Sequence, residues 1–194
     1  MKILVIGAGG VGSWLVEEIA VCVEQGQIDA FSEIIVADND IVEVEQIKYQ
    51  NFQLKDIGLN KALVLAMRFE NSGIRAKSER IEKENQLKGF DFIILCVDNE
   101  KTREMVIRYS HKSGADFLDL RATGRQIFVM PKRTLEKNLA FIDNFDKNEY
   151  SCQEKEDLDK GLIQKGNKIA ALCGCQMLLN AIRGHGNKEH VMMI

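Results

Sequence analysis

The stretch "KILVIGAGGVGSWLVEEIA" (residues 2–20) decides the fold of this chain. Its first part, residues 2–6, is almost wholly apolar and ends at a glycine, which is typical of a buried strand at the centre of a parallel sheet. From Val11 to Val23, apolar residues recur at helical spacing, while most of the glutamates fall on the opposite side. The stretch therefore predicts a strand, a glycine-rich turn and a helix in immediate succession.

The turn between this strand and helix carries the pattern G-x-G-x-x-G. In this motif the first glycine makes a tight turn, the second lets a phosphate approach the backbone, and the third lets the helix pack on the strand. The helix start then offers free N–H donors and a positive dipole end to an anion. A tight turn without a ligand is the alternative, but the position between strand and helix favours a phosphate-binding loop. The glycines concerned are Gly7, Gly9 and Gly12, with Gly10 beside them.

An aspartate ends the second predicted strand, residues 33–38. At this position, folds with such a glycine loop place a carboxylate on the ribose hydroxyls of a nucleotide, so Asp38 is a candidate ribose ligand. A plain turn at residues 38–40 ("DND") is the alternative. On these residues alone, NAD, FAD, ATP and S-adenosylmethionine all fit the site.

Strand and helix patterns alternate over the first 120 residues, which predicts a parallel sheet with right-handed crossovers. Residues 143–161 are charged and aperiodic and indicate a surface loop. The last predicted helix, residues 167–184, is apolar on nearly every side and is expected to be buried, with Gly174 permitting close packing. The other predicted strands are 74–81, 90–99, 116–120 and 125–131, and the other predicted helices are 60–73 and 100–114. We expect one domain over residues 1–194, of the α/β class: a doubly wound, mainly parallel sheet with an antiparallel extension and a buried C-terminal helix.

Composition and charge exclude some kinds of partner and location. The net charge of −3 over 194 residues argues against nucleic acid as a partner, because nucleic-acid binders carry a clustered basic excess. The longest apolar stretch, residues 169–182, is too short to cross a membrane. The odd number of cysteines, five, without a secretion signal indicates a reducing compartment. The expected location is therefore cytoplasmic.

Two later stretches, residues 36–62 and 93–103, carry further motifs in order. These are D-x-D-x-V, a helix start I-G-x-x-K-A, and D-N-x-x-T-R at the end of a strand. Together with the glycine loop, they resemble the adenylation domain of the ThiF/MoeB/HesA family, the relatives of ubiquitin-activating enzymes. The resemblance covers about residues 2–131. The matching residues are Gly7, Gly9, Gly12, Asp38, Asp40, Lys61, Asp98, Asn99, Thr102 and Arg103, with a rough match at Gly124 and Gln126.

The resemblance implies ATP rather than NAD as the ligand. In the family, the C-terminal carboxylate of a ubiquitin-like or sulfur-carrier protein, ending in Gly-Gly, attacks the α-phosphate of ATP and releases pyrophosphate. The resemblance also implies a homodimer. Carried over to this chain, it gives Lys61 to the phosphate oxygens, Asp98 to Mg²⁺, and Arg103 to pairing with Asp98 or steadying its loop. The nucleotide-binding residues it implies are Gly7, Gly9, Gly10, Gly12, Asp38, Asp40 and Lys61.

Without the resemblance, the three charged residues allow plainer interpretations. Lys61 is then a solvated lysine at a helix start, Asp98 a helix N-cap, and Arg103 a surface charge.

The segment "QIKYQ" (residues 46–50) departs from the family pattern N-L-x-R-Q. Tyr49 replaces the arginine that contacts the ATP phosphates in the family, whereas Gln50 is retained; Lys48 is close by but need not point the same way. The family's N-terminal helix, which sends an arginine into the partner subunit, has no counterpart before the first strand. A catalytically weakened nucleotide-binding scaffold is therefore the alternative function, and an NAD-dependent oxidoreductase is a third hypothesis.

The cysteines and histidines give weaker signals. Cys152 is expected to be exposed, as a nucleophile, a persulfide carrier or a plain surface thiol. Cys173 and Cys175, with His185 and His190 nearby, do not favour a structural zinc site, because C-x-C within a helix presents both sulfurs poorly to one metal. His111 is expected to be exposed.

Overall fold

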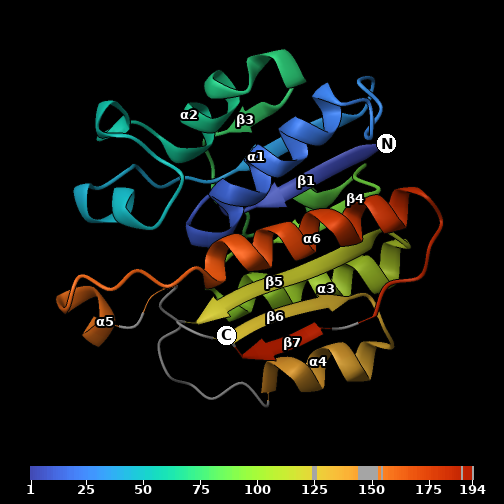
Figure 1. Ribbon diagram of the computed structural model, residues 1–194. Helices are drawn as coiled ribbons and strands as arrows, with labels where there is room; N and C mark the ends of the chain where they lie inside the picture. The colour runs from blue at the N-terminus through green and yellow to red at the C-terminus, as the bar shows by residue number, and fades with distance from the viewer. Residues whose placement is uncertain (124–125, 144–152, 154, 189, 194) are drawn as a thin grey trace.

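The computed structural model describes residues 1–123, 126–143, 153, 155–188 and 190–193. Across these described residues, seven strands form one sheet in the order β3-β2-β1-β4-β5-β6-β7 (Figure 1). Neighbours from β3 to β5 pair parallel, whereas the β5–β6 and β6–β7 pairs are antiparallel. The strands are β1 Lys2–Ile6, β2 Glu33–Ala37, β3 Arg75–Lys77, β4 Phe92–Leu95, β5 Asp116–Thr123, β6 Gln126–Pro131 and β7 His190–Met193. The predicted fold class is confirmed.

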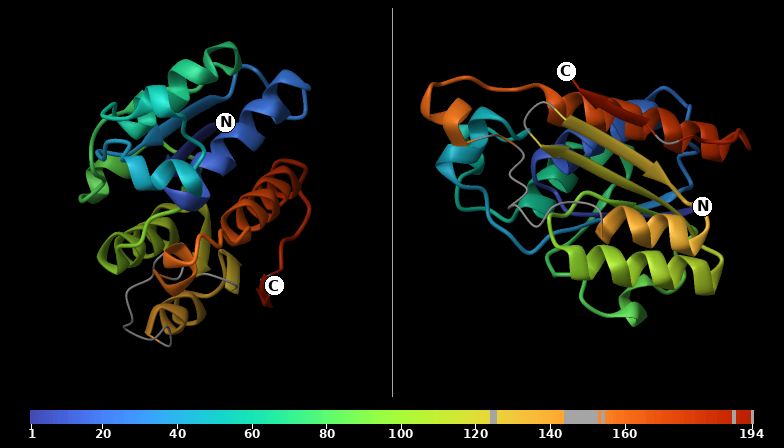
Figure 2. Two further views of the ribbon diagram at one scale, coloured as in Figure 1. Left: turned by 60° about the vertical axis from the view of Figure 1, so that its left-hand side comes forward. Right: turned by 90° about the horizontal axis from the view of Figure 1, so that it is seen from below.

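Helices cover both faces of this sheet. Figure 2 shows α1 and α6 side by side on one face and α3 with α4 on the other. Short 3₁₀ helices occupy the connections η1 Val44–Lys48, η2 Leu54–Asp56, η3 Glu70–Ser72 and η4 Glu84–Leu87. The α-helices are α1 Gly10–Glu24, α2 Lys61–Arg68, α3 Glu100–Ser113, α4 Leu135–Asp143, α5 Lys155–Asp159 and α6 Gly166–Ile182.

The central strand β1 explains why its sequence is continuously apolar. Its side chains alternate between the faces of the sheet, so Ile3 and Val5 join the core under α1 and α6. Leu4 and Ile6 join the core under α3. All four are buried, and each contributes about 1.5–3 kcal/mol to the free energy of folding. A strand covered on both faces needs apolar residues at every position.

The C-terminal helix α6 is buried along most of its surface. A Cβ at Gly174 would lie 2.4 Å from Cδ1 of Leu120 on β5, so the predicted close packing at this glycine is confirmed. The expectation of a helix buried on nearly every side is wrong along one stripe. Lys168, Leu172 and Gln176, each four residues apart, are exposed.

Several sequence-based boundaries differ from the structure. The predicted strand 74–81 contracts to the three residues of β3, because only its first part pairs with β2 at the sheet edge. The loop expected over residues 143–161 contains α5 and begins with the last residue of α4; residues 144–152 and 154 lie outside the described residues. Helix α4 was not predicted, although Leu135, Leu139 and Ile142 have helical spacing and pack in the α3 core.

His111 is half-buried rather than exposed. Its Nε2 lies 3.3 Å from Oδ1 of Asn138, and its ring meets Phe117 edge-on with the ring centres 6.3 Å apart. The α3–α4 contact therefore holds this side chain. Among the described residues, the longest apolar helices fall short of what a membrane crossing needs.

Candidate nucleotide site

A crevice opens where the chain leaves neighbouring strands in opposite directions. β1 continues into α1 on one face of the sheet, and the adjacent β4 continues into α3 on the other. In open α/β sheets, such diverging connections leave a ligand crevice at the carboxyl ends of the strands. The cavity here has a volume of about 480 Å³, within the usual range for small-molecule sites, which is about 300–1,000 Å³.

The glycine loop forms one wall of this cavity. Gly7 has φ +95°, and a Cβ there would lie 2.7 Å from the carbonyl oxygen of Cys96; a Cβ at Gly12 would lie 1.9 Å from the carbonyl oxygen of Gly7. At these two positions the protein's own backbone leaves no room for a side chain. At Gly9, by contrast, a Cβ would meet nothing within 4 Å, and the residue lines the cavity together with Gly10. The space that a phosphate would need therefore lies over Gly9.

Asp38 connects the end of β2 to the glycine loop. Its Oδ2 accepts a hydrogen bond from Ala8 N–H at 2.6 Å, and its Oδ1 accepts one from Asp40 N–H at 2.8 Å. Burial raises the pKa of Asp38, and the hydrogen bonds from Ala8 and Asp40 oppose that rise. The bond to Asp40, two residues along, is the turn given above as the alternative. Asp38 also lines the cavity, and its ribose role stays a prediction.

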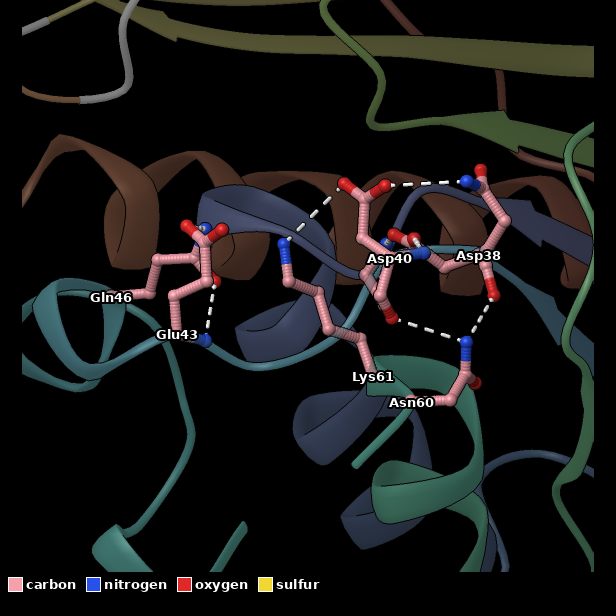
Figure 3. A network of polar contacts seen from close by, with 8 residues as sticks. Asp38, Asp40, Glu43, Gln46, Asn60 and Lys61 are labelled. Atoms are coloured by element: carbon pink, nitrogen blue, oxygen red, sulfur yellow. Dashed lines mark hydrogen bonds and ion pairs between the residues drawn. The ribbon is translucent and has the colours of Figure 1, made fainter. Parts of the chain in front are cut away.

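Lys61 is the first residue of α2 and is only 3% exposed. Its Nζ lies 3.6 Å from Oδ2 of Asp40, whose side chain is 63% exposed at the cavity (Figure 3). Asn60 caps α2 by accepting from Leu63 N–H, and its amide also donates to the carbonyls of Asp38 and Asp40. The interpretation of Lys61 as a solvated surface lysine is therefore wrong. The capped helix start holds its ammonium group at the cavity.

Asp98 lies in the loop between β4 and α3 and is exposed at the same cavity. It is not the cap of α3: Oδ1 of Asn99 accepts from the N–H groups of Lys101 and Thr102 instead. The carboxylate therefore has no capping role. A carboxylate oxygen is a hard ligand of the kind that suits Mg²⁺, which usually takes one or two carboxylates plus phosphate oxygens. In the described part of the chain, no three His, Cys, Asp or Glu residues gather into a metal cluster.

Arg103 contacts neither Asp98 nor the surface. Its guanidinium group pairs with Asp119 on β5 and donates to the carbonyl oxygen of Val97, next to Asp98. Its exposed fraction is 5%. The expected pairing with Asp98 and the surface-charge interpretation are both wrong. The contact with Val97 agrees with the other expected role, that of steadying the loop.

Asp119 and Arg121 were missed by the sequence analysis. Oδ2 of Asp119 accepts from Nε and Nη2 of Arg121 at 3.0 and 2.7 Å, while Arg103 pairs with the same carboxylate. All three side chains are buried, and both arginines line the cavity. A signal existed: residues i and i+2 of a strand share one face, so the charged pair in "LDLRA" marked a polar site within an apolar strand. Arg80, exposed at the cavity, carried no such signal.

The segment 46–50 lines the cavity without supplying a cation. Tyr49 is half-buried there, and Lys48 faces a neighbouring hollow instead, so Lys48 does not replace the family's arginine. Gln50 is buried, and its Oε1 accepts no hydrogen bond. A buried, unpaired acceptor beside a cavity suits a ligand that donates a hydrogen bond.

The cysteines do not assemble a site among the described residues. Sγ of Cys22 lies 3.6 Å from Sγ of Cys175, and both are buried free thiols. Burial raises the pKa of the Cys175 thiol, with Cys22 adding to that rise. Cys173 is half-buried. Cys152 and Gly124 lie outside the described residues.

Fold and crevice together define a nucleotide-binding α/β protein of the Rossmann-like kind. Within that class, the model of the ThiF family matches residues 1–192, so the chain belongs to the ThiF family. The resemblance stated from the ordered motifs is thereby confirmed.

Two comparisons with individual proteins agree with this family. A tRNA threonylcarbamoyladenosine dehydratase from Haemophilus influenzae is 29% identical over 133 residues, covering 64% of this chain and 48% of the dehydratase. The structure of E. coli MccB with ATP matches with a TM-score of 0.70 at 14% identity, covering 99% of this chain and 63% of MccB. A complex of the microcin C7 biosynthetic enzyme MccB with N-formylated MccA gives a TM-score of 0.71 at 14% identity, covering 99% of this chain and 64% of that one.

The chain thus spans about half the length of the dehydratase and less than two thirds of MccB. At this level of identity, the match with MccB establishes a shared fold.

Proposed function

We propose that this chain is an ATP-dependent adenylyltransferase that activates the C-terminal glycine carboxylate of a small ubiquitin-like or sulfur-carrier protein. The observation that carries the proposal is the convergence of Lys61 and Asp98 on one cavity, above a glycine loop that is open at Gly9. Family membership and the ATP complex of MccB support the same reaction class.

The reaction requires an anionic carboxylate to approach a polyanion, so catalysis consists mainly of charge stabilisation and positioning. A carboxylate oxygen of the carrier forms a bond to the α-phosphorus, and the bond from that phosphorus to the bridging oxygen of pyrophosphate breaks. Lys61 holds phosphate oxygens as a point charge. Asp98 would hold Mg²⁺, which supplies further positive charge to the phosphates when bound.

The remaining residues position the nucleotide. Gly9 and Gly10 offer backbone N–H groups at the start of α1, where no side chain caps the helix. Asp38 accepts from the ribose hydroxyls, with Asp40 beside it. Arg103 acts as a positioning residue, because it ties the backbone next to Asp98 to β5.

A direct test uses ATP labelled with ³²P at the α-phosphate and a carrier protein ending in Gly-Gly. We expect labelled acyl-adenylate with the wild-type chain and its loss in Asp98→Ala and Lys61→Ala. Lys112→Ala, an exposed lysine near the end of α3, is the matched control and keeps activity. Full activity in Asp98→Ala would refute the metal assignment.

The second candidate function, a nucleotide-binding scaffold with little turnover, is favoured by Tyr49. Losing one preorganised charged group from such a site costs about 10²–10³ in rate. ATP binding with background pyrophosphate exchange would select it. A thermal-shift panel of ATP, ADP, AMP, NAD and S-adenosylmethionine, with and without Mg²⁺, also tests the oxidoreductase hypothesis, because a ligand that binds only the folded state raises its melting temperature.

The proposed function also implies the oligomeric state, the location and the kind of substrate. We expect a homodimer, which sedimentation velocity tests directly. We also propose a reducing, cytoplasmic setting, which the odd number of cysteines supports. A tRNA substrate, which the name of the Haemophilus relative suggests, is disfavoured by the net charge of −3.

A further inference from the structure

A second hollow, of about 250 Å³, lies beside the nucleotide cavity and shares Tyr49 and Gln50 with it. Its walls come from Trp14 on α1, from the segment 47–52 and from the residues around the start of α6, 163–168. The volume is below the range of about 300–1,000 Å³ that holds a whole small molecule. It fits one or two side chains of a longer ligand.

The charge of this hollow has one sign. Lys48, Lys165 and Lys168 line it, and no Asp or Glu does so among the described residues. Two carboxylates bond to residues of its wall: Glu17 accepts from Asn51, and Asp157 accepts from Gln164. The start of α6, a helix of 17 residues without a side-chain cap, points a positive dipole end at the same place. An anionic group is the complementary ligand.

Asn167 gives independent evidence of a ligand. The residue is 2% exposed and lines the hollow, and within the described part of the chain neither its Oδ1 nor its Nδ2 has a hydrogen-bond partner. Leaving a donor and an acceptor unpaired in a buried position is unfavourable, and native proteins rarely do so without a function. One donor next to one acceptor matches a peptide group, which offers a carbonyl oxygen and an N–H.

The remaining wall is apolar. Trp14, Ile47, Phe52 and Ile163 contribute to it, and the ammonium group of Lys168 sits 3.9 Å from the centre of the Trp14 ring. A side chain entering the hollow therefore meets both an aromatic surface and a cation. An acidic residue next to an apolar one, within a peptide, fits these neighbours.

We infer that this hollow binds an acidic peptide segment, with Asn167 pairing with its backbone and the lysines pairing with its carboxylates. The inference rests on the proposed function for one point only, namely that this segment precedes the C-terminus that is adenylated next door. The shared wall of Tyr49 and Gln50 makes that path short.

The test measures binding without ATP, using the fluorescence of Trp14, which is the only tryptophan of the chain. The probes are acetyl-Leu-Asp-Asp-Ala-Gly-Gly, its counterpart with Asn in place of each Asp, and inorganic phosphate. We expect saturable change with the acidic peptide and about ten-fold weaker binding of the amide peptide. Equal affinity for the two peptides, or displacement of the acidic peptide by millimolar phosphate alone, would overturn the inference.

Variants assign the effect to the hollow. Asn167→Leu is expected to bind the acidic peptide about five- to ten-fold more weakly while its melting temperature stays the same or rises, because a buried unpaired amide is removed. Lys165→Gln is expected to weaken binding in the same direction, and Lys112→Gln, on the other face of the sheet, to leave it unchanged. Wild-type affinity in Asn167→Leu contradicts the inference.

The two proposals fail separately. Peptide binding with no adenylate formed would reject the proposed function and keep the hollow as a peptide site. Adenylate formed on a carrier, with no Trp14 response to the acidic peptide, would reject the peptide site and keep the proposed function.

Discussion

The buried cluster of Arg103, Asp119 and Arg121 gives the most direct test of how the crevice wall is held. Asp119 is 1% exposed, and both arginines pair with its carboxylate. Asp119→Ala would leave guanidinium groups buried next to each other without that acid. Breaking a buried ion pair by removing one partner costs about 3–5 kcal/mol of the free energy of unfolding. For a domain of this length, about 2–4 °C per kcal/mol gives a fall in melting temperature of about 6–20 °C.

The assay is urea denaturation followed by circular dichroism, with thermal unfolding beside it. Glu104→Ala is the matched control, because Glu104 pairs with Arg108 one turn away on the exposed side of α3. Exposed pairs of this kind contribute about 0.3–0.5 kcal/mol. Asp119→Asn keeps the volume and one acceptor oxygen, so an intermediate loss is expected. A loss below about 1 kcal/mol in Asp119→Ala would refute the reasoning that this carboxylate stabilises the two buried guanidinium groups.

Three further predictions concern the cavity itself. Gly9→Ala is expected to change the free energy of unfolding by less than about 0.5 kcal/mol, yet to weaken ATP binding, measured by calorimetry, about ten-fold or more. Gly12→Ala is expected to unfold at a much lower temperature, because its Cβ would overlap the carbonyl of Gly7. Equal effects of the two substitutions would contradict the assignment of the phosphate to Gly9. Tyr49→Arg, which restores the family's phosphate cation, is expected to raise pyrophosphate exchange by about 10-fold or more, and an unchanged or lower rate argues that Tyr49 does not limit turnover. Burial raises the pKa of Asp38, so the folded chain holds the carboxyl proton of Asp38 more tightly than the unfolded chain does. The contribution of Asp38 to stability is therefore largest below its ordinary pKa and declines as the pH rises through its folded-state pKa. The stability of the wild type relative to Asp38→Asn, measured in urea from pH 4 to pH 7, is therefore expected to fall with rising pH, and a rise would reverse the sign of the pKa argument.

Local patterns were sufficient to predict the centre of the fold. The residues that form β1, the glycine loop and α1 are neighbours in sequence. Their structure therefore follows from the periodicity of their apolar residues and from the conformational freedom of glycine. The placement of Asp98 at the crevice was also predictable, because Asp98 follows β4 and the carboxyl ends of neighbouring parallel strands meet at one edge of a sheet. The placement of Lys61 there came only from the family resemblance.

Long-range contacts account for what the sequence could not predict. Lys61 is buried because Asn60 hydrogen-bonds to carbonyls 20 and 22 residues earlier in the chain, and no periodic pattern reports such a contact. The partner of Arg103 is Asp119 on another element, and nothing in the spacing of "DNEKTR" distinguishes that partner from Asp98. Lys48 likewise lines a hollow whose wall also includes residues from α1 and from the start of α6, far away in the sequence.

The cores on the two faces of the sheet differ in size. The face under α1 and α6 holds the larger apolar cluster, and the face under α3 and α4 holds the smaller one together with the charged cluster on β5. Opening a layer costs free energy in proportion to the apolar contacts it gives up. Amide protons of α3 are therefore expected to exchange with solvent before those of α1 do, and Asp98 lies in the loop that leads into α3. The chain thus places the loop that carries Asp98 on its more easily opened layer, and the glycine loop on the layer that opens last.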